Sequence, residues 1–349
     1  MSAHTQRIRV AVLGAGSFGT ALAALASSQA DTLLWARDPE VARLLQHQHR
    51  NPRYLPDIKL PAALRATASF QQAMDHVCAS QAGPGLIILG VPVAGLADAC
   101  QQVAAALTPG HNPQLSIIWV CKGFQHETGL LPHQIAQAAL AERPDVGLGV
   151  LSGPSFALEI AQGLPVALTL ATHHKTTTSA VLAALHGTNA RIYTSTDIIG
   201  VEVGGALKNI MAIACGISDG LGLGTNARAA LITRGLAEIQ RLGLALGGQA
   251  ETFTGLTGLG DLVLTATGAL SRNRQVGLAI GQGQPLKQIL ASGMTAEGVR
   301  CARAALALGL EHNIDLPITA AVCQVLFDGL APSQAVASLL AREARAEAP

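Results

Sequence analysis

The sequence predicts an α/β fold, with a doubly wound, mostly parallel Rossmann-type sheet domain in residues 1–193 and an all-helical domain in residues 194–349. Short apolar runs recur through the first half, with helical stretches between them. A GxGxxG motif follows the first of these runs. After about Tyr193 the runs stop and long helical patterns begin. A chain of 349 residues is long enough for two domains, each with its own core.

The individual elements follow from these patterns. A parallel strand buried on both faces is apolar throughout, so we expect strands at 8–13, 32–36, 86–91, 117–121, 146–151 and 166–171. Helices are expected between them at 20–28, 39–48, 95–107 and 130–141. In the second half the helical patterns cover 225–246, 273–281, 285–292, 297–312 and 318–329.

Composition excludes several classes of function. A net charge of +1 gives no basic face for phosphate backbones, so we expect no nucleic-acid partner. Six cysteines without a CxxC pair are typical of reduced thiols in a cytoplasmic protein. Charges or turn residues interrupt each apolar run before the roughly 18 residues of a membrane span, and the first expected strand leaves no room for a signal peptide. We therefore expect a cytoplasmic protein without a membrane span.

The GAGSFG segment at 14–19 predicts a dinucleotide site. Gly14 permits a tight turn, Gly16 lets a pyrophosphate approach the backbone, and Gly19 lets the following helix pack closely on the sheet. The phosphates would lie at the helix N-terminus, where free N–H groups point toward them. The alternative is a purely structural glycine turn.

Arg37 and Asp38 follow the second expected strand, where the adenosine ribose would lie. An arginine there can pair with a 2′-phosphate, which favours NADP over NAD as the cofactor. Asp38 could still accept a hydrogen bond from a ribose hydroxyl. It could equally be the N-cap of a helix that begins at Pro39.

Two of the five lysines are candidates for chemistry. Lys208 lies in an apolar, glycine-rich stretch at 205–230, where a partly desolvated amine with a lowered pKa suits proton transfer. The alternative is a lysine whose stem covers apolar surface. Lys122 follows the strand at 117–121, at the carboxyl edge of the sheet, where such folds bind ligands. Lys59, Lys175 and Lys287 have polar surroundings and are expected to be solvated.

Three further segments place polar groups beside glycines or at helix starts. In SGPSFA, Gly153 and Ser155 could bind a substrate while Ala157 packs near a cofactor; an ordinary capped turn is the alternative. Asp261 follows a glycine turn and is either an N-cap or a site residue. The third segment contains Ser271, Arg272 and Asn273, which suit a phosphate dianion at a helix start, although a capping turn with exposed arginines has the same sequence.

No histidine pair has metal-ligand spacing, so no metal is expected. The chain also has no GxSxG nucleophile elbow and no P-loop.

Together these segments resemble the bacterial-type NAD(P)-dependent glycerol-3-phosphate dehydrogenase family. The resemblance covers nearly the whole chain. It comprises GAGSFGTALA at 14–23, LWARDPE at 34–40, CKGF at 121–124, SGPSFA at 152–157, the long segment at 205–238, GLGDLVLT at 258–265 and SRNRQVG at 271–277.

The resemblance implies hydride transfer between a nicotinamide cofactor and dihydroxyacetone phosphate, giving sn-glycerol 3-phosphate for phospholipid biosynthesis. It places cofactor contacts at Ser17, Phe18, Arg37, Lys122, Ala157, Arg272, Thr295 and Glu297. It places substrate contacts at Lys122, Gly153, Ser155, Lys208, Asp261, Ser271, Arg272 and Asn273. The segment with Thr295, MTAEGVRCA, departs from the family's valine-rich form.

In the mechanism that the resemblance implies, Lys208 is the general acid and base. Lys122 polarises the substrate carbonyl, Asp261 orients Lys208 or a substrate hydroxyl, and Arg272 with Asn273 grips the phosphate. Two alternatives remain at this point: another two-domain hydroxyacid dehydrogenase, which would recognise a carboxylate, and a non-enzymatic dinucleotide sensor. The apolar helical half makes a homodimer possible.

Overall fold

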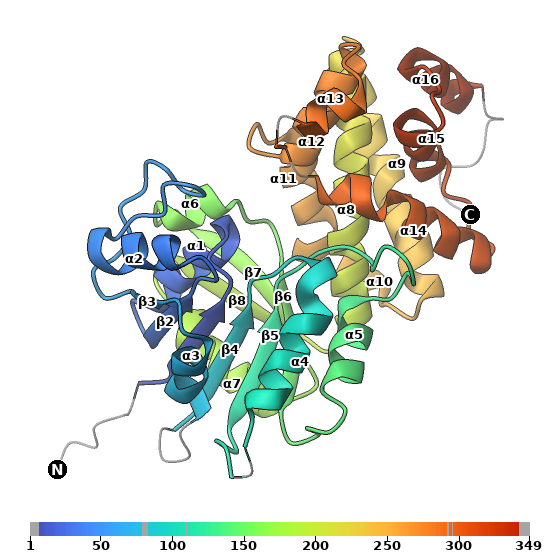
Figure 1. Ribbon diagram of the computed structural model, residues 1–349. Coiled ribbons are helices and arrows are strands. Elements are labelled where there is room, and N and C mark those ends of the chain that lie inside the picture. Colours follow the sequence, from blue (N-terminus) through green and yellow to red (C-terminus); the bar gives the residue numbers. More distant parts are fainter. Residues whose placement is uncertain (1–6, 79–82, 109, 292, 295, 342–349) are drawn as a thin grey trace. The chain divides into compact units, whose positions relative to one another are not determined.

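The structure, a computed structural model, describes residues 7–78, 83–108, 110–291, 293–294 and 296–341 (Figure 1). These residues form two compact units. The first contains the chain up to Lys122 and again Leu130–Glu202, and the second contains Gly123–Gly129 and the chain from Val203 onward.

The predicted boundary at 193/194 falls inside the last strand, β8 (Ala190–Ser195). In the structure the first unit continues to Glu202, because Ile198 and Val201 are buried in the core of the sheet unit. The first turn of the following helix therefore belongs to the sheet unit, and its continuation belongs to the helical unit.

The first unit is built on one eight-stranded sheet with the order β3-β2-β1-β4-β5-β6-β7-β8. Every neighbouring pair is parallel except β6 and β7, which confirms the predicted doubly wound, mostly parallel sheet. The other strands are β1 (Arg9–Leu13), β2 (Asp31–Trp35), β3 (Arg65–Thr67), β4 (Gly85–Leu89), β5 (Leu115–Trp119), β6 (Gly147–Ser152) and β7 (Val166–Ala171).

Helices cover both faces of this sheet. Alternate residues of β1 point into two separate cores, with Val10 and Val12 in one and Ala11 and Leu13 in the other. The helical elements are α1 (Ser17–Ala26), α2 (Pro39–Gln48), α3 (Phe70–Cys78), η1 (Val93–Gly95), α4 (Leu96–Ala106), α5 (Pro132–Ala139), α6 (Ala157–Ala161) and α7 (Lys175–Leu185). The strand order reverses beside β1, whose neighbours are β2 and β4, so the ligand crevice of this fold class is expected at the carboxyl end of β1.

The regular elements in the described part of the second unit are all helical. Its elements are α8 (Ile198–Gly220), which starts in the first unit, α9 (Gly224–Ala245), α10 (Ala250–Thr254), η2 (Leu256–Gly260), α11 (Asp261–Thr267), α12 (Arg272–Gly281), α13 (Leu286–Ala291), α14 (Glu297–Glu311), α15 (Pro317–Phe327) and α16 (Pro332–Leu340). Glycines let α8 and α12 approach closely. A Cβ added at Gly216 would lie 2.1 Å from the Arg274 carbonyl oxygen, and one at Gly277 would lie 2.1 Å from that of Ile213.

Helix α8 bears on the expected absence of a membrane span. By length and composition alone its 23 residues are apolar enough to cross a membrane, but Glu202, Lys208 and Asp219 interrupt its apolar sequence, as expected. In addition, 94% of its most apolar window is buried inside the protein, as in the central helix of a packed helical unit. Within the described residues it is the one helix that passes this test.

Candidate active site

The glycine-rich turn lies at the carboxyl end of β1, and its three glycines have different reasons to be glycine. Gly14 has a φ of +121°, and a Cβ there would meet the Gly90 carbonyl oxygen at 2.6 Å. A Cβ at Gly19 would lie 2.0 Å from the Gly14 oxygen. At Gly16, however, a Cβ would have no atom within 4 Å. The protein itself therefore requires the first and third glycines but not the second, which is the one that a pyrophosphate would approach.

The start of α1 is suited to an anion. Gly16 is its N-cap without a capping side chain, and the first turn contains no acidic residue. Its first amides and the positive end of the helix dipole therefore have no competing anion within the first turn. These residues fit the pyrophosphate of a dinucleotide.

The sequence did not predict how this turn is held. Buried Asn51 donates from Nδ2 to the Ala15 carbonyl oxygen (3.0 Å) and to Thr20 Oγ1 (2.9 Å). Ser17 Oγ donates to the carbonyl oxygen of Tyr54 (3.1 Å). Both partners come from the loop after α2, so this loop supports the predicted cofactor turn.

The residues after β2 divide into two roles. Asp38 is the N-cap of α2, and its Oδ1 accepts from the Glu40 backbone N–H at 2.9 Å. Arg37 is exposed. A carboxylate that caps a helix is less available to a ribose hydroxyl, whereas the guanidinium is accessible to an anion.

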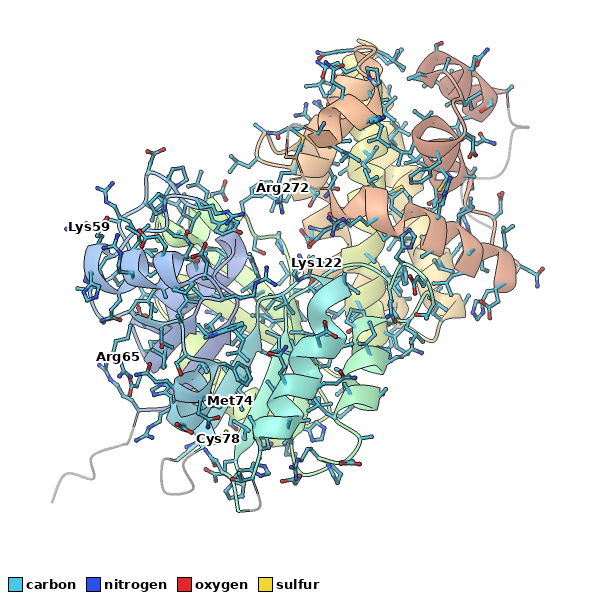
Figure 2. The ribbon with its side chains drawn as sticks, viewed as in Figure 1. Lys59, Arg65, Met74, Cys78, Lys122 and Arg272 are labelled. Atoms are coloured by element: carbon cyan, nitrogen blue, oxygen red, sulfur yellow. The ribbon has the colours of Figure 1, made fainter. Side chains whose placement is uncertain are left out.

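Lys122 is hydrogen-bonded to the SGPSFA segment at 152–157, and both belong to the first unit. It follows β5 and is half-buried (Figure 2). Its Nζ donates to the Gly153 carbonyl oxygen at 3.3 Å, and Ser155 Oγ donates to the same oxygen at 3.0 Å. Gly153 has a φ of +133°, a backbone conformation that favours glycine. Ala157 begins α6 two residues further on, so the structure brings all four residues to neighbouring strand ends.

Lys208 lies in a polar cluster inside the helical unit. Only 7% of the residue is exposed, and Asp261 is fully buried. The Nζ of Lys208 donates to Asp261 Oδ1 at 2.5 Å and to Thr265 Oγ1 at 2.9 Å. Burial among apolar groups disfavours the ammonium form, whereas the adjacent carboxylate favours it. The amine is thus oriented by two partners.

Thr265 was missed by the sequence analysis. It lies one turn after Asp261 on α11, and its hydroxyl also donates to the Asp261 carbonyl oxygen at 2.6 Å. Residues four apart share one helix face, so the spacing itself was a usable signal.

A second buried network starts from Asn209, the neighbour of Lys208 and another residue that the sequence analysis missed. Asn209 Oδ1 accepts from Asn273 Nδ2 at 2.9 Å, and Asn273 Oδ1 accepts from the Gly298 N–H at 3.0 Å. Asn209 Nδ2 donates to Glu297 Oε2 at 3.5 Å. The network joins α8, α12 and α14, and it places Asn273 and Glu297 beside the lysine helix.

The predicted phosphate segment divides into structural and accessible groups. Ser271 Oγ is the N-cap of α12 and accepts from the Arg274 N–H. Arg274 donates from Nε and Nη2 to Asp219 Oδ2, at 2.9 and 2.7 Å, and so points back to α8. Arg272, the first residue of α12, is exposed (Figure 2). Among these side chains, Arg272 is therefore the one that can reach a phosphate in solution.

The remaining candidate residues are the three other lysines, Thr295 and possible metal ligands. Lys59, Lys175 and Lys287 are exposed, as expected. Thr295 lies outside the described residues. No group of three or more His, Cys, Asp or Glu side chains in the described chain could hold a metal ion.

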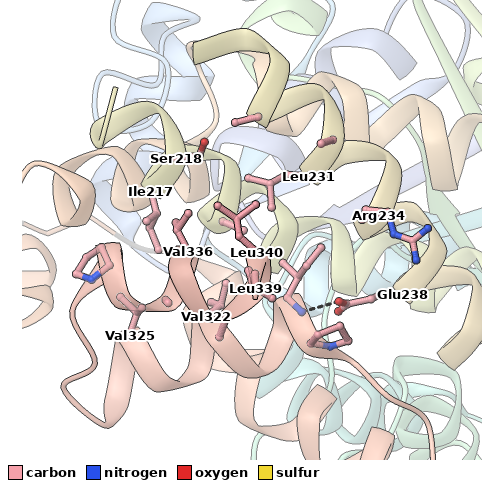
Figure 3. A pocket seen from close by; sticks show the side chains of 18 of the residues that line it. Ile217, Ser218, Leu231, Arg234, Glu238, Val322, Val325, Val336, Leu339 and Leu340 are labelled. Atoms are coloured by element: carbon pink, nitrogen blue, oxygen red, sulfur yellow. Dashed lines mark hydrogen bonds between the residues drawn. The ribbon is translucent and has the colours of Figure 1, made fainter. Parts of the chain in front are cut away.

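A cavity of about 570 Å³ lies elsewhere in the helical unit, among α8, α9, α15 and α16 (Figure 3). Its lining is mostly apolar and includes Ile217, Leu231, Val322 and Leu340, but none of the predicted site residues. We therefore do not assign the chemistry to this cavity.

Comparisons with known proteins agree over the length of the chain. Residues 9–178 match the family model described as NAD-dependent glycerol-3-phosphate dehydrogenase N-terminus, and residues 197–337 match its C-terminus counterpart. A protein of Burkholderia cenocepacia (strain HI2424) named glycerol-3-phosphate dehydrogenase (NAD(P)+) is 58% identical over 342 residues, which are 97% of this chain and 100% of that protein.

Solved structures agree with this result. The crystal structure of glycerol-3-phosphate dehydrogenase from Coxiella burnetii has a TM-score of 0.86 at 40% identity and covers 96% of this chain and 99% of its own. The enzyme from Saccharomyces cerevisiae has a TM-score of 0.79 at 24% identity, covers 94% of this chain and 98% of its own, and shows the fold alone. The chain therefore belongs to the NAD-dependent glycerol-3-phosphate dehydrogenase family, whose members are oxidoreductases.

Proposed function

We propose that this dehydrogenase interconverts dihydroxyacetone phosphate and sn-glycerol 3-phosphate with NAD(P)H, and that Lys208 is its general acid and base. The observation that carries the proposal is the buried ammonium held between Asp261 Oδ1 and Thr265 Oγ1. Family membership and the name of the Burkholderia relative support the reaction and a cofactor that is either NAD or NADP.

In the direction of reduction, Lys208 donates a proton from Nζ to the carbonyl oxygen of the substrate. The nicotinamide cofactor, when bound, supplies the hydride for the carbonyl carbon. In the reverse direction the neutral amine takes the hydroxyl proton. Asp261 and Thr265 fix Nζ, so the proton donor is held in place before the substrate arrives.

Other residues bind and orient the reactants. Lys122, with Gly153 and Ser155 at the neighbouring strand end, polarises the same carbonyl oxygen and also approaches the cofactor. Arg272, exposed at the start of α12, binds the substrate phosphate, which is chemically inert here and serves to position the carbonyl. Ser17, Phe18 and Ala157 line the cofactor site, with Arg272 and Glu297 contributing from the helical unit.

We further propose that NADPH is preferred to NADH. The capping role of Asp38 and the exposure of Arg37 support this choice. A charge-assisted hydrogen bond is worth about 1.5–3 kcal/mol, so Arg37→Ala should weaken NADPH binding by roughly tenfold to a hundredfold and leave NADH binding almost unchanged. Arg43→Ala is the matched control, because Arg43 is an exposed arginine of α2 that pairs with Glu40.

The proposal also covers the metabolic role of the product and the oligomeric state of the protein. The product would supply phospholipid synthesis in the cytoplasm. The protein would be a homodimer whose second copy covers the apolar cavity of the helical unit, since Leu223 and Leu340 of its lining are 44% and 80% exposed. Light scattering after size exclusion tests the dimer, and Leu340→Glu should shift it toward monomer.

The deciding experiment is a spectrophotometric assay with NADPH and NADH at equal concentrations. Reduction of dihydroxyacetone phosphate, with little reduction of a β-keto acid, is the expected result. Preference for the keto acid would instead identify a carboxylate-recognising dehydrogenase. Absence of cofactor oxidation with any phosphorylated ketone would contradict the proposed function.

A further inference from the structure

A second buried acid, Glu202, lies outside the chemistry described so far. Its Oε1 accepts from the indole Nε1 of Trp119 at 2.7 Å, and its Oε2 lies 2.6 Å from Nδ1 of His133. The Glu202 side chain is fully buried, and 14% of the His133 side chain is exposed. We call Trp119, His133 and Glu202 the hinge cluster.

The hinge cluster is costly to bury, so its presence needs a reason beyond stability. Burial raises the pKa of Glu202, while the bonds from His133 and Trp119 lower it. Replacing a buried ionic group and its partners with apolar residues is often neutral or stabilising. What such a group does provide is a directional attachment, because both carboxylate oxygens are tied to named partners on different elements.

The position of the hinge cluster in the chain explains why such an attachment is useful. The chain passes between the two units at three places: after Lys122, after Gly129 and after Glu202. Trp119 lies three residues before the first crossing, His133 lies four residues after the second, and Glu202 is the last residue before the third. All three partners belong to the first unit, so one buried carboxylate joins the three segments through which that unit connects to the other.

We propose that the hinge cluster is a positioning device for the dehydrogenase reaction. It fixes, within the first unit, the end of β5 that leads to Lys122 and the first turns of the helix that carries Lys208. Its residues do not touch the reactants. They act through the two lysines, so loosening the cluster should impair the hydride-transfer step and leave the binding of cofactor to the first unit intact. This inference rests on the proposed roles of both lysines.

Simple geometry gives the size of the effect. Glu202 and Lys208 are six residues apart on α8, which is about 9 Å along a helix axis. A tilt of roughly 6° at the Glu202 end therefore moves the backbone at Lys208 by about 1 Å. A misplacement of about 1 Å can lower a rate by on the order of a hundredfold. A change of kcat/KM by tenfold or more is thus within reach of a small loss of anchoring.

The test needs a variant that removes the attachment without leaving a fully buried polar group unpaired. Trp119→Phe with Glu202→Leu removes both the indole donor and the carboxylate, and the remaining His133 ring is 14% exposed and can bond to water, so the double variant should still fold. Its kcat/KM for dihydroxyacetone phosphate, per mole of folded enzyme, should fall at least tenfold. The Kd for NADPH, measured by fluorescence, should change by a much smaller factor, because the glycine turn and Arg37 lie outside the cluster.

Two further variants serve as controls, one conservative change within the hinge cluster and one change at a buried acid elsewhere. Glu202→Gln keeps an acceptor for Trp119 and replaces the second carboxylate oxygen with an N–H donor, which the neutral His133 ring can accept at Nδ1, so it should retain most of the activity. Glu238→Gln alters a different buried acid, which accepts from the Ile318 and Thr319 N–H groups at the start of α15. It is the control for a general loss of stability and should leave kcat and KM unchanged.

A kcat/KM within twofold of wild type in the folded double variant would overturn the inference and leave the cluster a stability element only. If the double variant does not fold, Trp119→Phe alone, which loses one N–H donor, decides the matter: a fall of threefold or more supports the inference, and an unchanged value overturns it. Wild-type enzyme without activity on dihydroxyacetone phosphate would count against the proposed function instead.

Discussion

Replacing Lys208 by methionine tests the proposed mechanism most directly. Methionine keeps most of the length and apolar volume of the side chain but removes the ammonium that Asp261 and Thr265 hold. General acid–base catalysis contributes about 10²- to 10⁴-fold to a rate. We therefore expect kcat for dihydroxyacetone phosphate reduction to fall by that range, while the Kd for NADPH changes little.

The same substitution should also destabilise the protein, and the structure gives the magnitude. Asp261 is fully buried and loses the ammonium 2.5 Å from its Oδ1. Breaking a buried ion pair by removing one partner costs about 3–5 kcal/mol. Since a domain is stable by only about 5–15 kcal/mol, loss of activity in this variant alone has two explanations.

A double variant separates them. Lys208→Met with Asp261→Asn removes both charges, so no unpaired carboxylate stays buried. We expect most of the lost unfolding free energy to return, measured by denaturant titration, whereas kcat stays as low as in the single variant. Recovery of activity together with stability would show that Lys208 has only a structural role. A kcat within tenfold of wild type in folded Lys208→Met would also remove it from the chemistry.

The sheet was largely predictable because its central strands are buried on both faces. β4 and β5 are apolar at nearly every position and fully buried, so their sequences have the continuous pattern that parallel strands require. β3 and β8 were not predicted. β3 has only three residues, and β8 alternates between buried and exposed positions at the edge of the sheet. Edge strands face solvent on one side, so their apolar signal is weaker.

The side chains that hold the candidate site in place were harder to predict than the candidate site residues themselves. Gly16 and Lys208 stand out locally, one by motif and one by contrast with its apolar neighbours. Asn51 supports a turn 36 residues away, and Asn209 bonds to a residue 64 positions further along the chain. Such pairings depend on tertiary packing, and a single sequence has no pattern that reports them.

The segment around Arg272 shows a different limit. A helix start that binds an anion and a helix start that is merely capped use the same residue types. Three candidates for the phosphate therefore looked equivalent in sequence. In the structure their surroundings differ: Ser271 caps α12, Asn273 bonds to Asn209, and Arg272 is exposed.

Three further predictions concern the cofactor turn, the thiols and pH. Gly16→Ala should cost less than about 1 kcal/mol of stability, because a Cβ there meets nothing, yet raise the KM for NADPH; Gly19→Ala should prevent normal folding, since its Cβ would overlap the Gly14 oxygen. Burial raises the pKa of Cys301 and Cys100 to about 12, so both should resist iodoacetamide in the native protein at pH 8 and react once it is unfolded; rapid alkylation of either would contradict the burial. Burial also raises the pKa of Glu238 above its ordinary value of 4.5, despite the N–H groups it accepts from. The folded state therefore holds this proton more tightly than the unfolded state, and the contribution of Glu238 to stability is greatest below pH 4.5 and is lost as the pH rises through the folded pKa. Glu238→Gln lacks this titration, so its unfolding free energy relative to wild type should rise between pH 4.5 and neutrality, and a difference that falls or stays flat with pH would show that the carboxyl group is not held as its burial implies.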